Sequence, residues 1–200
     1  MPAKDFGKFF NVAHIEQDSF IYGPGKRFVI WLQGCSLACN GCWNKAMWSF
    51  SAKELIHRED LLKEIVGYTD IDGITILGGE PLHQAENVLW LANAVRKQTS
   101  LNVFLFTGYE RYELERMGLL DQMLKIFDIL VIGRYVQSYR DTTKKWIGSS
   151  NQEILYPKGS RCPRETLEGE QVEIVIEESG SIRVLGFPDP GFVSDILQHK

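Results

Sequence analysis

Three of the four cysteines in this chain, Cys35, Cys39 and Cys42, lie within eight residues of one another. Soft thiolate ligands favour iron–sulfur clusters or zinc over magnesium and calcium. A four-iron cluster held by three cysteines keeps one iron without a protein ligand, and that iron can take a ligand from outside the chain. Gly34 and Gly41 allow the backbone to fold tightly around such a cluster and to donate N–H groups to its sulfurs. The loop therefore predicts an iron–sulfur site.

Zinc and disulfides are the alternative uses of these thiols. A structural zinc site could be completed by Cys162 or His57, but structural zinc usually takes two pairs of ligands at knuckle spacing, unlike the spacing here. Two disulfides would suit a small secreted protein, whereas we find no secretory signal near the start of this sequence and expect a cytoplasmic protein. We therefore keep a zinc-stabilised binding module as the non-enzymatic alternative.

Composition excludes two classes of partner. The chain has 200 residues, with 22 Lys and Arg against 26 Asp and Glu, and its net charge of −4 gives no bulk electrostatic case for nucleic acid. The apolar run at 28–32 is far too short to span a bilayer. We expect one sizeable core with an appendage, and no membrane partner.

The segments around the cysteines alternate between apolar runs, typical of buried strands, and amphipathic patterns, typical of helices. Continuous apolar runs predict buried strands at 27–33, 73–77, 102–106 and 128–132, and amphipathic patterns predict helices over 52–68, 85–97 and 112–126. Such alternation is typical of right-handed βαβ units, so the predicted fold class is α/β with a mostly parallel sheet.

The character of the chain changes after residue 152. Residues 156–170 are polar, and two apolar runs at 172–176 and 182–185 flank a turn, which predicts an antiparallel hairpin. A short apolar stretch at 192–197 follows. We therefore expect a core over residues 1–152 and a C-terminal extension over residues 153–200 packed on it.

Unusual residues follow each of the first three predicted strands. The cysteine loop follows the first, Gly78-Gly79-Glu80 the second and Thr107-Gly108 the third. Ligands bind at this edge of α/β sheets because its loops converge there.

Each of these motifs also has a purely structural interpretation. The Gly78-Gly79 carbonyls and the Glu80 carboxylate could hold an ammonium group, but two glycines and a proline often only turn the chain. Thr107-Gly108-Tyr109 could contact a ligand or form a turn with a packed tyrosine. Trp43 could stack on a flat heterocycle or pack in the core.

These residues resemble the radical S-adenosylmethionine (radical SAM) enzymes, and more closely the activating proteins of anaerobic ribonucleoside-triphosphate reductase. The cysteine spacing carries the first resemblance, and the resemblance as a whole covers about residues 9–152. Six motifs in the same order carry the second: Gly23-Pro24-Gly25-x-Arg27, Gly34-Cys35, Gly41-Cys42-Trp43-Asn44, Gly78-Gly79-Glu80-Pro81-Leu82-His83, Thr107-Gly108-Tyr109 and Gly148-Ser149-Ser150-Asn151-Gln152.

The resemblance implies one 4Fe-4S cluster on Cys35, Cys39 and Cys42, with S-adenosylmethionine on the fourth iron. Reductive cleavage would give a 5′-deoxyadenosyl radical that removes hydrogen from a glycine of a large glycyl-radical enzyme. It also implies a flavodoxin- or ferredoxin-like electron donor and a partial (β/α) barrel of the radical SAM type, with the hairpin as an extension.

The resemblance further implies which residues bind S-adenosylmethionine. Gly78, Gly79 and Glu80 would hold its methionine ammonium, and the backbone at Gly41, Cys42 and Trp43 would meet its adenine. Thr107 and Gly108 complete the implied set of cofactor-binding residues: Gly41, Cys42, Trp43, Gly78, Gly79, Glu80, Thr107 and Gly108.

Two departures from the family pattern leave the substrate open. Ile147 stands where an arginine would be usual, and about fifty residues follow Gln152, beyond the length of the short activators. A radical enzyme that acts on a small molecule or a peptide is therefore the alternative to a glycyl-radical activase.

Overall fold

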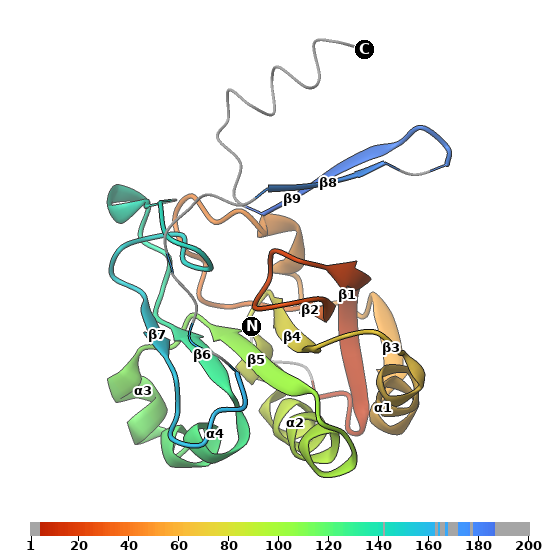
Figure 1. Cartoon of the computed structure of the whole chain (residues 1–200). Helices are drawn as coiled ribbons and strands as arrows, with labels where there is room; N and C mark the ends of the chain where they lie inside the picture. The colour runs from red at the N-terminus through yellow and green to blue at the C-terminus, as the bar shows by residue number, and fades with distance from the viewer. Residues whose placement is uncertain are drawn as a thin grey trace.

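The computed structural model describes residues 5–141, 143–162, 164, 167, 172–176 and 178–186. A seven-stranded sheet organises these residues (Figure 1). In spatial order its strands are β3 (Glu54–His57), β1 (Phe9–Ser19), β2 (Arg27–Leu32), β4 (Gly73–Gly78), β5 (Asn102–Thr107), β6 (Ile129–Ile132) and β7 (Glu153–Leu155).

The four central strands β2, β4, β5 and β6 are parallel and lie in register. Leu32 pairs with Gly78, and Thr107 pairs with Ile132. All six residues of β2 and all four of β6 are buried, as continuous apolar strands require when both faces of a sheet are covered. Because the strands are parallel, the loops that follow them meet at one edge of the sheet.

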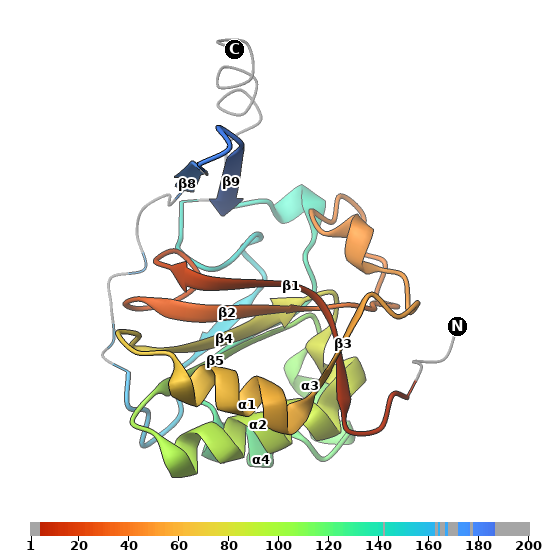
Figure 2. The ribbon, with the colours of Figure 1, turned by 90° about the vertical axis from the view of Figure 1, so that its right-hand side faces the viewer.

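Among the residues that the structure describes, the helices cover one face of the sheet. Figure 2 shows α1, α2 and α4 together on that side, packed on alternate strand residues such as Ile30, Ile76 and Leu105. The helices are α1 (Arg58–Gly67), α2 (Ala85–Gln98), α3 (Arg111–Arg116) and α4 (Leu120–Ile126), and the short 3₁₀ turns are η1 (Lys45–Met47), η2 (Pro81–Gln84) and η3 (Gln137–Tyr139).

The other face of the sheet is covered by irregular chain. Phe104, Ile129 and Val131 point to this side and pack against Trp146 and Ile147. No second layer of helices fills this side among the described residues, so space remains above the carboxyl ends of the strands.

The predicted helices and strands are partly wrong at the margins of the fold. β1 was not predicted, and the first residues of the expected helix at 52–68 form β3, which pairs with β1 from Phe9↔His57 to Val12↔Glu54. The helix proper begins at Arg58, where Glu59 and Asp60 in the first turn favour a helix start. The expected helix at 112–126 is two helices, α3 and α4, interrupted at Gly118.

The sheet is α/β and rich in parallel strands, but it is open. β1, β3 and β7 are antiparallel to their neighbours, and β3 and β7 form its two edges. The described strands therefore form no closed barrel. No helix among the described residues has the length and apolarity needed to cross a bilayer.

The predicted C-terminal hairpin is confirmed. β8 (Val172–Ile176) and β9 (Ile182–Gly186) form a separate two-stranded antiparallel sheet. Figure 2 shows it on the side of the large sheet opposite the helices. The apolar stretch expected at 192–197 lies outside the described residues.

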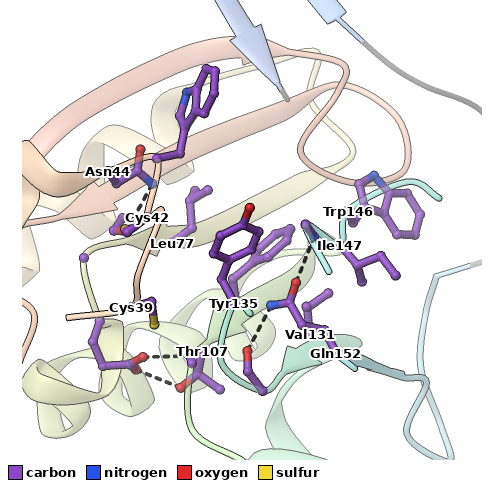
Figure 3. A pocket seen from close by; sticks show the side chains of 18 of the residues that line it. Cys39, Cys42, Asn44, Leu77, Thr107, Val131, Tyr135, Trp146, Ile147 and Gln152 are labelled. Atoms are coloured by element: carbon purple, nitrogen blue, oxygen red, sulfur yellow. Dashed lines mark hydrogen bonds between the residues drawn. The ribbon is translucent and has the colours of Figure 1, made fainter. Parts of the chain in front are cut away.

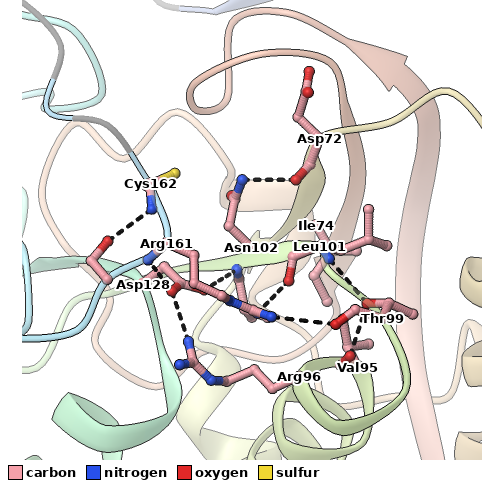
Figure 4. A network of polar contacts seen from close by, with 12 residues as sticks. Asp72, Ile74, Val95, Arg96, Thr99, Leu101, Asn102, Asp128, Arg161 and Cys162 are labelled. Atoms are coloured by element: carbon pink, nitrogen blue, oxygen red, sulfur yellow. Dashed lines mark hydrogen bonds and ion pairs between the residues drawn. The ribbon is translucent and has the colours of Figure 1, made fainter.

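A polar network ties the segment after β7 to the amino ends of the strands (Figure 4). The buried Asp128 carboxylate accepts hydrogen bonds from the backbone N–H groups of Val103 and Arg161, both at 2.8 Å, and from the Arg96 guanidinium at 2.7 Å. Cys162 follows directly and packs in the buried cluster with Phe104. Cys162 therefore lies at the amino end of the sheet, away from the other cysteines.

Candidate functional site

A pocket opens where the loops after the parallel strands converge. All ten residues expected to bind a cluster or cofactor line it (Figure 3). They are Cys35, Cys39, Gly41, Cys42, Trp43, Gly78, Gly79, Glu80, Thr107 and Gly108. The sheet therefore brings together three motifs that lie far apart in the sequence.

The cysteine loop is fixed at its beginning by backbone hydrogen bonds. The Gly34 N–H donates to the Met47 carbonyl at 2.8 Å and the Cys35 N–H donates to the Trp48 carbonyl at 3.1 Å. Between the first two cysteines, Ala38 has a φ of 48°, a left-handed conformation that costs energy for a residue with a side chain. The loop is thus held in one strained shape.

The thiols of this loop are free and half-buried. Burial raises the pKa of Cys35 and of Cys39, and the neighbouring Cys42 adds to the effect at Cys39. Thiols of this kind are protonated at neutral pH, so a metal centre that binds them must displace protons.

The arrangement does not offer a single-ion site. Within the described ranges, no three His, Cys, Asp or Glu side chains lie close enough together to hold one metal ion. Cys162 is at the far end of the sheet and His57 is on the edge strand β3, so neither completes the tetrahedral zinc site of the alternative interpretation. Three soft thiols around one shared pocket fit a polynuclear cluster, which is larger than a single ion.

Gly78 and Gly79 have a steric role in addition to any role in binding. A Cβ on Gly78 would lie 2.3 Å from the Leu32 nitrogen, and one on Gly79 would lie 2.5 Å from the Gly34 carbonyl oxygen. Gly78 also has a φ of 125°, which side chains disfavour. Only glycine lets the chain after β4 pass this close to the start of the cysteine loop.

Glu80 is buried and fully engaged inside the protein. Its Oε1 accepts hydrogen bonds from the Leu82 N–H at 2.9 Å and the Thr107 hydroxyl at 2.8 Å, and its Oε2 accepts from the Gly108 N–H at 2.8 Å. Burial raises its pKa to about 7, although these hydrogen bonds oppose the rise. The carboxylate joins the loop after β4 to the end of β5.

This contact also explains the motif after β5. Thr107 is buried and orients Glu80, and its Oγ1 accepts the Tyr109 N–H at 3.1 Å. The motif therefore forms a turn, and its first two residues line the pocket. Trp43 is 52% exposed at the pocket, so the expectation that its indole packs in the core is wrong.

His83 holds the residue next to the first cysteine. Its Nε2 lies 3.2 Å from the Ser36 backbone nitrogen and 3.0 Å from the Ser36 hydroxyl oxygen. Burial lowers the pKa of His83, which favours the neutral ring that can accept the Ser36 N–H. His83 is part of the Gly78–His83 motif, but its contact with Ser36 was not predicted from the sequence.

Several pocket residues were not predicted from the sequence. Asn44 donates to the Gly78 carbonyl at 3.4 Å and so joins the cysteine loop to the glycine pair. Tyr135, in the loop after β6, lines the pocket with Trp146 (Figure 3). Tyr135 could have been predicted from the sequence, because ligands bind where loops follow the parallel strands and Tyr135 lies in the loop after the fourth of them.

The Gly148–Gln152 motif connects the loop after β6 to the segment that carries Trp146 and Ile147. The Gln152 side-chain oxygen accepts the Gly148 N–H at 2.8 Å, and its amide donates to the Gly133 carbonyl at 2.9 Å. Ile147, in the position where the resemblance leads us to expect an arginine, is buried and lines the pocket. An apolar side chain therefore replaces any polar contact at this point.

Comparisons with known proteins identify a family model and relatives that match this chain. The family model described as "4Fe-4S single cluster domain" matches residues 21–155. The anaerobic ribonucleoside-triphosphate reductase-activating protein of Haemophilus influenzae is 33% identical over 144 residues, which cover 67% of this chain and 90% of the relative. The protein of that name from Enterobacteria phage T4 is 30% identical over 150 residues, covering 72% and 92%. Among solved structures, the crystal structure of QueE from Escherichia coli is similar over 50% of this chain and 53% of that one, with a TM-score of 0.39 and 23% identity.

Proposed function

Because the chain belongs to the 4Fe-4S single cluster domain family, we propose that it binds one 4Fe-4S cluster through Cys35, Cys39 and Cys42 and uses it to cleave S-adenosylmethionine. The observation that carries this proposal is the single pocket shared by three soft thiols and the motifs after β4 and β5. A three-cysteine set keeps one iron open for the amino and carboxylate groups of S-adenosylmethionine.

The glycine pair and Glu80 would hold the methionine end of S-adenosylmethionine. The carbonyl groups of Gly78 and Gly79 would accept hydrogen bonds from its ammonium, and Glu80 would place negative charge behind them. Since Glu80 already accepts three internal hydrogen bonds, its contribution includes keeping the glycine loop in place. Trp43, exposed at the pocket, is available to the adenine together with the backbone of Gly41 and Cys42.

The bound groups supply the redox chemistry, and the chain positions and shields it. A bound, reduced cluster would supply the one electron needed to cleave S-adenosylmethionine into methionine and a 5′-deoxyadenosyl radical, which would remove hydrogen from the substrate. Leu77, Phe106, Val131 and Ile147 line the pocket with apolar side chains. These side chains would exclude water from a radical that reacts without selectivity.

The proposed substrate is a glycine in the backbone of a glycyl-radical enzyme. Relatives that match across 90% or more of their own length carry the name of activating proteins of anaerobic ribonucleoside-triphosphate reductase. A flavodoxin- or ferredoxin-like protein would deliver the electron. We also propose that the open sheet corresponds to the partial barrel of the radical SAM type, with residues 1–152 as the core and residues 153–200 as its extension.

One anaerobic experiment tests the cluster and the substrate together. The reconstituted protein would be reduced and mixed with S-adenosylmethionine and the anaerobic ribonucleoside-triphosphate reductase of the same organism. We expect stoichiometric iron and sulfide, 5′-deoxyadenosine, and the glycine-centred EPR doublet on the reductase.

Each failure in this experiment has a separate meaning. Formation of 5′-deoxyadenosine without the EPR doublet would favour the small-molecule or peptide enzyme. Stoichiometric zinc without iron or sulfide would remove both enzymatic proposals. A reductase in which the radical glycine is replaced by alanine is the matched control for the doublet.

A further inference from the structure

The β8–β9 hairpin presents an apolar face outward. Its register pairs Ile174 with Val184 and Ile176 with Ile182, which places these four side chains on one face. Ile174, Ile176 and Ile182 are 46%, 71% and 39% exposed. Contiguous apolar side chains in water usually mark an interaction surface.

The other face of the hairpin carries Glu173 and Arg183 alternating with the half-buried Val175 and Leu185, and its charged side chains hold the hairpin to the rest of the protein. Glu173 accepts hydrogen bonds from the Ser19 hydroxyl at 2.6 Å and from the Phe20 N–H at 3.3 Å. Arg183 forms an ion pair with Glu16 at 2.7 Å. The face that carries these charged side chains is thus turned toward the rest of the protein, and the isoleucines lie on the opposite face.

The hairpin joins the pocket at its last residue. Gly186 lines the pocket, and its N–H donates to the Tyr22 hydroxyl at 3.0 Å. Tyr22 lines the same pocket. The outward apolar face therefore begins beside the pocket that would hold the reactive groups.

The same pocket has a positively charged rim. Arg140 and Lys144 line it and are exposed. Neither side chain forms a hydrogen bond or ion pair with another residue among those that the structure describes. Two such cations on a chain with a net charge of −4 favour an acidic group at the entrance.

We propose that the apolar face of the hairpin and the Arg140–Lys144 rim together dock the protein substrate, through a segment that carries apolar side chains next to acidic ones. The inference rests on the proposed function, because a protein whose backbone glycine must enter the pocket has to be held beside it. The hairpin lies beyond residues 21–155, which the family model matches, so the apolar half of this docking surface is an addition to the cofactor-binding core, whereas Arg140 and Lys144 lie within it. Removing the apolar half should affect substrate capture without affecting cofactor cleavage.

Charge substitutions on the hairpin test the apolar half of the surface. In the full-length protein, the double variant Ile174→Lys/Ile176→Lys would be compared with Val66→Lys, an apolar position on α1, across the sheet from the hairpin, that is exposed to about the same degree as Ile174. The probe is the anaerobic ribonucleoside-triphosphate reductase of the same organism. We expect its Kd to rise at least about tenfold for the double variant only, and the EPR doublet to fall with it.

Three results would overturn the docking proposal. An unchanged Kd would show that the partner binds elsewhere. A lower Tm in the double variant would show that the chain's own residues, such as 187–200, cover the face. A change in molecular mass in solution would show that a second copy covers it.

The rate of 5′-deoxyadenosine formation without partner should be the same in the wild type, the double variant and Val66→Lys. If the wild type gives no EPR doublet at all, the proposed function fails. If the wild type gives the doublet and the double variant matches it, only the docking inference fails.

Charge reversal tests the basic half of the surface. Arg140→Glu/Lys144→Glu should slow association with the reductase and remove most of its dependence on salt concentration. Association that stays equally fast and equally sensitive to salt would assign the rim no part in docking.

Discussion

The two ends of the parallel strands differ in how their polar groups are satisfied. At the amino end, Asp128 is fully buried and accepts hydrogen bonds from two backbone N–H groups and from arginine side chains (Figure 4). At the carboxyl end, Cys35, Cys39 and Cys42 line a pocket with free, half-buried thiols. The amino end stabilises the fold, and the carboxyl end holds the reactive groups.

Arg27 strengthens the contrast at the amino end. Its guanidinium is fully buried and donates to the Pro24 carbonyl at 2.9 Å, the Asn102 side-chain oxygen at 2.7 Å and the Ile74 carbonyl at 2.6 Å. A buried charge is tolerated only when its donors are satisfied. The Gly23-Pro24-Gly25-x-Arg27 motif thus organises the turn before β2 and lies away from the thiols.

The largest expected effect comes from the carboxyl end. Replacing Cys35, Cys39 or Cys42 by alanine should abolish the cluster, because each change removes the thiolate of one iron. Iron and sulfide analysis after anaerobic reconstitution should fall to near zero, while far-UV circular dichroism stays the same. A variant that retains full iron and sulfide would remove that cysteine from the ligand set.

Asp128→Ala should give the largest loss of stability at the amino end. It leaves the Val103 N–H and two arginines without their buried carboxylate, and breaking such a pair costs about 3–5 kcal/mol. Urea unfolding would measure the loss. The folded fraction should still take up a full complement of iron and sulfide, and loss of the cluster from folded protein would contradict the separation of the two ends.

The two ends should also respond to pH with opposite sign. Burial raises the pKa of Asp128, but the hydrogen bonds from Arg161, Val103 and Arg96 outweigh it and lower the pKa, so this stabilisation is lost as pH falls through the folded-state pKa. Glu80 has a pKa raised from 4.5 to about 7, so the free energy of unfolding should fall as pH rises across that window.

Glu80→Gln isolates this second effect. The change in pKa corresponds to about 3 kcal/mol between pH 4.5 and 7, and the variant should lack this slope. Because the lowered pKa of His83 gives a slope of opposite sign, the quantity to measure is the difference between wild type and variant in urea unfolding at each pH. A difference that does not vary with pH would show that Glu80 is ionised throughout.

The sequence predicted the centre of the fold and the composition of the pocket. Strands 27–33, 73–77, 102–106 and 128–132 are confirmed within one or two residues, because a fully buried parallel strand is a continuous apolar run. The ten expected pocket residues lie together because each lies at the end of a parallel strand or in the loop after it, and the loops after parallel strands meet at one edge of the sheet.

The sequence could not predict features that depend on long-range partners. β1 and β3 form through antiparallel pairing of Phe9 with His57, and no local pattern encodes that pairing. The buried state of Glu80 depends on Thr107 and Gly108, which are far away in the chain. The outward orientation of the hairpin's apolar face could not be predicted for a similar reason, since it depends on contacts with Glu16 and Ser19.

The smallest expected effect comes from Cys162, the cysteine at the amino end of the sheet, which can be compared with the three cysteines at the carboxyl end. Cys162 is buried beside Phe104, among apolar side chains at the amino end of the sheet. Replacing it by alanine removes one buried sulfur, so the free energy of unfolding should fall by about 1 kcal/mol while iron and sulfide content stays at the wild-type level. Loss of the cluster in Cys162→Ala protein would mean that this thiol reaches the metal, and the division between the two ends would then fail.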